Sequence, residues 1–138
     1  MRPTHPSRTR ARRGNALVEG ALVMTAFMMI LFGIMDFARA IFVYNTTQFA
    51  AREGARYASV RGSASGDTAT SDTVRDYALG LMAGVPTSDV TVTTTWTPNN
   101  TPGSYVTVAV NATFTPITPY MRSGTWNLSG TSKLMISQ

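Results

Sequence analysis

The chain of 138 residues contains no cysteine, and its only histidine, His5, lies close to the N-terminus. The absence of cysteine excludes disulfide bonds, thiolate nucleophiles and thiolate metal sites. The absence of histidine after His5 removes the imidazole that most catalytic dyads and many metal sites need. We therefore expect a protein that is not an enzyme and that holds no metal or cofactor.

Acidic residues are absent from residues 1–14, and this leader accounts for the whole net charge of +5. A nucleic-acid footprint needs lysine and arginine clustered on a folded face, whereas this leader is rich in Arg, Pro and Thr. We therefore interpret it as a topogenic signal and predict no direct nucleic-acid partner. Its basic residues are Arg2, Arg8, Arg10, Arg12 and Arg13.

Charge is also scarce in residues 15–35, which read NALVEGALVMTAFMMILFGIM and carry Glu19 as their only charged side chain. A helix over 16–35 would span roughly 30 Å, the thickness of the hydrocarbon core of a bilayer. Because the arginines precede this segment, the positive-inside rule predicts a cytoplasmic N-terminus and a translocated C-terminal part. The alternative, a buried core helix, would need more apolar sequence around it than the chain has. An ionised carboxylate in hydrocarbon is costly unless it is paired, so Glu19 needs a partner.

Proline is absent from residues 36–60, and Gly54 is the only glycine there. The sequence thus predicts one long helix over 15–61, with a transmembrane half (about 15–35) and an outer half (36–61). Ala50, Gly54 and Ala58 form a line of small residues, which suits close packing either on the chain's own domain or on a partner helix. A second stripe has the spacing of a core-facing seam: Phe37, Ile41, Tyr44, Ala51, Ala55 and Ala58.

Small polar residues fill 62–72, which we interpret as a linker to a domain over 73–138. Ser71 or Asp72 is expected to cap a short helix, and the segments 89–97, 105–115 and 126–136 have the composition of strands. Gly130 weakens the third strand. The predicted fold class is α+β, in which a long transmembrane helix continues into a small extracytoplasmic domain. That domain has one short helix and a roughly three-stranded antiparallel sheet, and it gains most of its core by covering the outer half of the long helix.

Three interpretations compete for the N-terminal segment. Ala38-Arg39-Ala40 would serve as the cleavage site of a secretory signal peptide, although a charged residue in the apolar run and a helix that continues through the site argue against it. Arg12 and Arg13 match a twin-arginine signal poorly. The third interpretation is a prepilin, in which the chain is cut between Gly14 and Asn15 and Glu19 becomes position five of the mature chain.

The phrase RRGNALVEGALV, the apolar run and the phrase AAREGARYASVRG together resemble TadE-like pseudopilins, minor pilins of the type IV-like tight-adherence pilus system. The resemblance covers roughly residues 12–62 and extends weakly to the C-terminal part, where a short Thr/Val-rich strand region ends in SKLMISQ. It implies that a prepilin peptidase cuts after Gly14, before Asn15, and that Glu19 acts in assembly with other pilins in the inner membrane. Where the family has an aromatic residue after the glutamate, this chain has Gly20. Small residues of the membrane half, Gly20, Ala21 and Gly33, would allow neighbouring helices to approach closely.

Two alternatives come from other classes of protein. The first is an uncleaved single-pass signal anchor whose outer domain binds an envelope partner. The second is a secreted enzyme whose soluble product starts near Ile41, and the missing histidine, cysteine and clustered carboxylates weigh against it.

Overall fold

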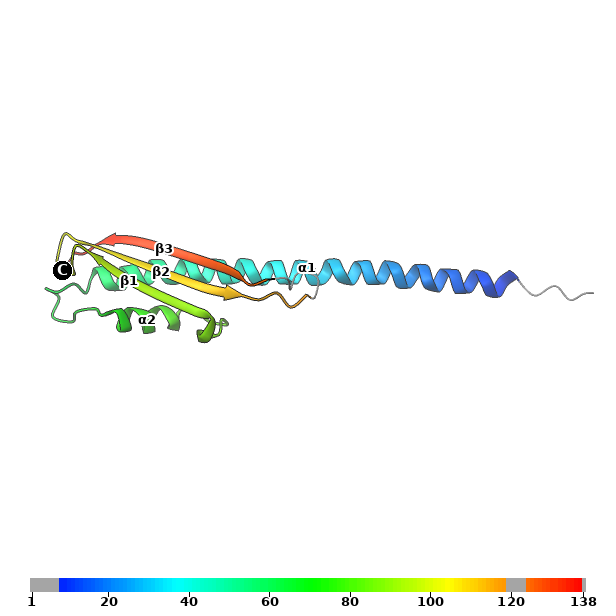
Figure 1. Ribbon diagram of the computed structural model, residues 1–138, viewed down its shortest axis with the longest axis horizontal. Helices are drawn as coiled ribbons and strands as arrows, with labels where there is room; N and C mark the ends of the chain where they lie inside the picture. The colour runs from blue at the N-terminus through cyan, green and yellow to red at the C-terminus, as the bar shows by residue number, and fades with distance from the viewer. Residues whose placement is uncertain (1–7, 119–123, 138) are drawn as a thin grey trace, which may run out of the picture. The chain divides into compact units, whose positions relative to one another are not determined.

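The computed structural model describes residues 8–118 and 124–137, with side chains from Gly14 onward, so the first half of the predicted leader lies outside the described residues. The chain divides into two compact units, Met1–Phe37 and Ala38–Gln138. The predicted α+β class with a three-stranded antiparallel sheet is confirmed. The elements in Figure 1 are α1 (Arg8–Ser59), α2 (Ser71–Gly80), a short 3-10 helix η1 (Thr87–Asp89), β1 (Val90–Thr97), β2 (Tyr105–Phe114) and β3 (Trp126–Met135).

Helix α1 begins earlier than the sequence pattern indicated, at Arg8 rather than at Asn15. No proline interrupts the backbone hydrogen bonds between Arg8 and Ser59, and a lone glycine such as Gly14 lowers helix stability without ending a helix. The last part of the basic leader is therefore helical and continuous with the apolar segment.

Helix α2 is capped by Thr70 instead of Ser71 or Asp72. The backbone of Thr70 is extended, and its hydroxyl accepts a hydrogen bond from the Thr73 N–H at 3.2 Å. The hydroxyl of Thr73 accepts in turn from the Thr70 N–H at 2.9 Å. This reciprocal pair satisfies two backbone donors that the first turn of a helix leaves free.

The sheet has the strand order β1-β2-β3, and both pairs are antiparallel. Val110 of β2 lies between Val92 of β1 and Gly130 of β3. Even-numbered residues of the central strand are buried, whereas its odd-numbered residues are exposed or partly exposed. The sheet therefore has one face for the core and one for solvent.

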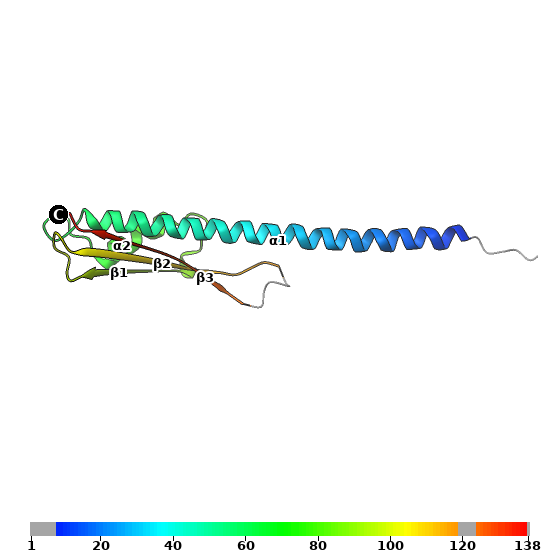
Figure 2. The same cartoon turned by 90° about the horizontal axis from the view of Figure 1, so that it is seen from above.

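The core of the second unit forms where α2 and the outer half of α1 lie on the same face of the sheet (Figures 1 and 2). Fully buried side chains come from both helices and from the sheet: Ala50, Ala51, Ala55 and Ala58 of α1, Val74 and Ala78 of α2, and Val106, Val108 and Val110 of β2. Burying one valine side chain contributes about 1.5–3 kcal/mol. The alanines contribute less area but let the sheet lie close to the helix.

The core-facing stripe predicted for α1 is wrong in its first half. Phe37, Ile41 and Tyr44 are exposed, at 60%, 45% and 46%. Ala40 and Thr47 are buried instead. The helix presents its small residues to the sheet, because bulky side chains on that side would hold the two apart.

Gly130 marks the closest approach of β3 to α1. A Cβ atom at this position would lie 2.7 Å from the Thr47 carbonyl oxygen and 2.9 Å from the Gln48 backbone nitrogen. Beside this contact, the side-chain Nε2 of Gln48 donates a hydrogen bond to the Ser129 carbonyl oxygen at 3.1 Å. Gly130 therefore lets strand and helix backbones touch, which explains a glycine that appeared only to weaken the strand.

Candidate functional site

The described residues of the first unit are helical, and most of the apolar side chains from Gly14 onward are uncovered. Leu17 is 75% exposed, and Leu22 and Ile30 are similarly open to solvent. The most apolar window of this helix has a mean hydropathy of 2.2, and none of it is buried. Exposed apolar surface of this extent is unusual for a soluble monomer. By length and composition the helix could cross a membrane.

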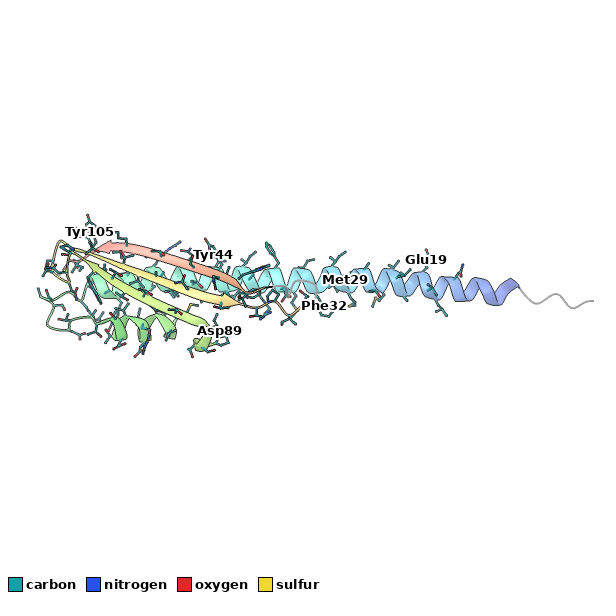
Figure 3. All side chains as sticks on the ribbon, in the orientation of Figure 1. Glu19, Met29, Phe32, Tyr44, Asp89 and Tyr105 are labelled. Carbon is teal, nitrogen blue, oxygen red and sulfur yellow. The ribbon has the colours of Figure 1, made fainter. Side chains whose placement is uncertain are left out.

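Glu19 lies on the exposed surface of α1, one helical turn after Asn15 (Figure 3). Among the residues that the structure describes, none forms an ion pair with it. The carboxylate is therefore available to a group from outside the chain. Its neighbours along the helix are apolar, so a charged partner would face little competition from side chains of the same chain.

A shallow groove of about 500 Å³ lies beside this carboxylate. Its floor is open at Gly20, where an added Cβ would meet no atom within 4 Å. Ala16 and Gly20 are one turn apart, and such a pair of small residues permits the backbone of another helix to approach. The groove is lined by Ala16, Glu19, Gly20, Val23, Met24 and Phe27.

Gly14 and Asn15 both lie inside α1 and are exposed. An added Cβ at Gly14 would meet no atom within 4 Å, so the chain's own packing does not require a glycine there. The peptide bond between the two residues belongs to a continuous helix. A protease would have to unwind this turn to reach it.

Two further residues predicted for helix packing lie in the same segment. Ala21 is exposed and Gly33 is partly buried. The Thr25 hydroxyl donates to the Ala21 carbonyl at 2.8 Å. This bond satisfies the only hydroxyl of the segment 15–35 within its own helix, which lowers its cost in hydrocarbon.

The small-residue line of the outer half faces the chain's own domain. Ala50 and Ala58 are fully buried. A Cβ added at Gly54 would lie 3.3 Å from Val108 Cγ1 of β2 and 3.7 Å from the Ala78 Cβ of α2. Of the two arrangements that the sequence left open, packing on the own domain is therefore the one present, and this line is closed to a partner helix in this conformation.

The opposite side of the outer half carries uncovered apolar side chains. Ile41, Phe42, Tyr44 and Phe49 are exposed. A groove of about 280 Å³ runs beside Tyr44 and Phe49 and includes Asn45, Gln48 and Arg52. Sequence reasoning assigned Ile41 and Tyr44 to the core. Their bulk is the signal that could have excluded them from the core, because a helix packed closely against a sheet has no room for large side chains between the two.

Ion pairs join several charged groups on the surface of the second unit. Arg61 binds Asp67 at 3.0 Å, Arg75 lies 3.1 Å from Asp76, and Glu53 lies 3.5 Å from Arg56. In the part of the chain that the structure describes, no three acidic, histidine or cysteine side chains gather in a metal-binding group. These ion pairs are exposed, so each contributes at most about 1 kcal/mol.

The comparisons with known proteins agree with this picture of the N-terminal segment. The family model described as TadE-like protein matches residues 14–56, from Gly14 through most of α1. No curated protein and no solved structure matches the chain. The matched segment includes Gly14, Asn15 and Glu19. The resemblance predicted from the sequence is therefore confirmed over residues 14–56, which are similar to the TadE-like family.

Proposed function

We propose that this chain is a structural minor pilin, or pseudopilin, of a tight-adherence pilus system. In this proposal α1 holds the chain in the bacterial inner membrane, with the N-terminus in the cytoplasm and residues 38–138 on the other side. A prepilin peptidase removes residues 1–14. The mature chain then joins or primes a pilus by packing its helix against other pilins.

The uncovered apolar surface of α1 carries the proposal. A bilayer core accommodates about 20 helical residues, and the apolar run 15–35 is already that long. Yet the second unit also has exposed apolar side chains on α1, at Ile41, Phe42, Tyr44 and Phe49. Lipid in contact with the segment 15–35 would leave these residues in water. A bundle of similar helices would cover them, as assembly into a fibre requires.

Cleavage after Gly14 would also change the surroundings of Glu19. In the full chain α1 begins at Arg8, so Glu19 lies three turns into the helix. Removing residues 1–14 would move the start of the helix to Asn15, with a new ammonium group and free backbone N–H groups one turn from the carboxylate. A helix N-terminus attracts negative charge. The ammonium of a neighbouring subunit would pair with Glu19 and fix the register between subunits.

The processing step is tested by the N-terminus of the protein extracted from membranes. Mass spectrometry of the protein from cells that contain the peptidase should find a chain that begins at Asn15. Gly14→Ala should leave most of the protein uncut. Gly20→Ala is the matched control, because it makes the same change at another open position of α1 and should be processed normally. An intact N-terminus in wild type would contradict the proposal.

The assembly role is tested separately with Glu19→Gln, which keeps the shape of the side chain and removes its charge. The variant should be cleaved normally but should be missing from sheared pili. Glu53→Gln is the control on the outer half of the same helix. Normal incorporation of the Glu19 variant would show that the charge has no part in assembly.

One observation favours a second candidate, the uncleaved signal anchor. Helix α1 runs unbroken through the bond between Gly14 and Asn15, and a helical bond resists proteolysis until it unwinds. The anchor predicts an intact N-terminus in the same mass spectrum, so one measurement separates the two functions.

A further inference from the structure

The exposed face of the sheet is a regular array of neutral polar side chains, which we name the threonine face. Its rows run across the strands, so that Asn111 lies between Thr91 and Ser129, and Ala109 lies between Thr93 and Thr131. The face consists of Thr91, Thr93, Thr95 and Thr97 of β1, Tyr105, Thr107, Ala109, Asn111 and Thr113 of β2, and Asn127, Ser129, Thr131, Lys133 and Met135 of β3.

Charge is almost absent from this face, since Lys133 is its only charged side chain. The ion pairs of the outer domain lie on α1, on α2 and in the loop between them. Threonine is frequent in strands because of its β propensity, which explains its presence on the sheet. Propensity does not explain the lack of lysine and glutamate, which exposed strands ordinarily carry to prevent unwanted association.

The hydrogen-bonding groups of the threonine face are largely unused. Within the described residues, the only side-chain hydrogen bond on this face joins the Thr113 hydroxyl to the Asn127 amide oxygen at 3.5 Å. The hydroxyls of Thr93, Thr107 and Thr131 have no partner among those residues. Each hydroxyl can donate one hydrogen bond and accept two, so the face offers many donors and acceptors without charge.

The composition argues against a protein as the occupant. Binding energy at protein interfaces is concentrated in Trp, Tyr and Arg, whereas serine and threonine are rare among such residues. Only Tyr105 and Met135, paired at one end of the face, are large and apolar. The ring of Tyr105 is already in contact with Lys133, whose Nζ lies 4.5 Å from the ring centroid.

We propose that the threonine face binds a neutral polysaccharide. Neutral polar side chains recur at about 6.7 Å along the outward positions of β1 and at about 4.8 Å across the row formed by Thr91, Asn111 and Ser129. An extended sugar chain can therefore exchange hydrogen bonds with successive rows. Ala109 leaves the centre of the array free of bulky side chains. Tyr105, 45% exposed at one end of the face, adds a phenolic hydroxyl to the array. The binding needs no charge on the ligand and does not depend on cleavage after Gly14.

The experiment measures co-sedimentation of the full chain with insoluble chitin and cellulose, which are neutral, and with calcium-gelled alginate, which is anionic. A zwitterionic detergent is used, because the neutral sugar headgroups of maltoside detergents would compete. We expect retention on at least one neutral polysaccharide that persists at high salt, whereas any retention on alginate through the basic leader should be lost at high salt. The double variant Thr93→Lys/Thr131→Glu places two long charged side chains beside Ala109 and should reduce the bound fraction about tenfold, because it removes two neutral hydrogen-bonding groups and blocks the row.

The matched control is Ser63→Glu/Thr68→Lys, which adds the same charges at exposed positions between α1 and α2 and should bind like wild type. Circular dichroism checks the fold of each variant, and Ala109→Gln, which fills the centre without charge, replaces the double variant if that one unfolds. No retention on either neutral polysaccharide, or equal retention of wild type and face variants, would overturn the proposal. A change in oligomeric state on altering the face, without polysaccharide binding, would assign the face to a second copy of the chain and would also overturn it.

Discussion

The contact between β3 and α1 gives the sharpest prediction about stability, because Gly130 has no room for a side chain. In Gly130→Ala the new Cβ would lie 2.7 Å from the Thr47 carbonyl oxygen and 2.9 Å from two backbone atoms of Gln48. None of these atoms can turn away as a flexible side chain would, so strand and helix must separate. Overpacking of this kind costs about 1–3 kcal/mol.

Two smaller terms adjust this cost. Separation of the two elements would weaken the 3.1 Å hydrogen bond from Gln48 to the Ser129 carbonyl, a loss of about 0.5–1.5 kcal/mol. Replacing glycine by alanine also restricts the unfolded chain, which stabilises the folded state by about 0.4–1 kcal/mol. The net effect is a destabilisation of about 2 kcal/mol. For a domain of this size each kcal/mol lowers Tm by about 4–8 °C, so we expect a fall of about 8–16 °C.

The assay is thermal unfolding of the full chain in detergent, followed by near-ultraviolet circular dichroism. Its signal includes Trp96 and Trp126, which lie in the sheet, and the stacked pair Tyr57 and Tyr77. Gly80→Ala is the matched control, because Gly80 ends α2 in open space and alanine there should stabilise the helix by up to about 1 kcal/mol. If Gly130→Ala unfolded at the temperature of wild type or above it, β3 could not cross α1 at this distance, and the packing described for the second unit would be wrong.

Two other changes test the packing of the helices. Gly54→Ala should change the free energy of unfolding by less than about 1 kcal/mol, because a contact of 3.3 Å with Val108 opposes the gain in helix propensity. Gly54→Leu should cost about 3 kcal/mol through overpacking. Equal unfolding midpoints in urea for the two variants would contradict the burial of Ala50, Gly54 and Ala58. Thr70→Ala should cost about 0.5–2 kcal/mol by removing the N-cap of α2, and Thr68→Ala, which alters an exposed neighbour, should cost nothing measurable in the same titration.

Much of the outer domain could be predicted from local sequence patterns. The alternation of Val106, Val108 and Val110 with polar residues fixes which face of β2 is buried, because successive side chains of a strand point to opposite faces. The charge distribution likewise isolates the leader and the apolar run. The cap of α2 was missed by one residue, since Thr70, Ser71 and Asp72 are all good capping residues and only the backbone conformation selects among them.

The sequence did not predict which side of α1 packs against the sheet. A stripe of bulky residues, including Ile41 and Tyr44, and a line of small ones, Ala50, Gly54 and Ala58, are both consistent with helical periodicity. Amphipathicity favours the bulky stripe as the buried one. The sheet selects the small line, because close approach of two backbones excludes large side chains between them.

The sequence by itself determined the membrane-length apolar run, the position of Glu19 within it and the α+β order of elements, because these depend on local composition and period. Only the tertiary structure decided that Gly130 is a contact with Thr47, that Ala50 and Ala58 are covered by the chain's own domain, and that the threonines of three strands meet on one face. Each of these involves residues far apart in the chain, and their distances depend on how helix and sheet pack rather than on any local preference.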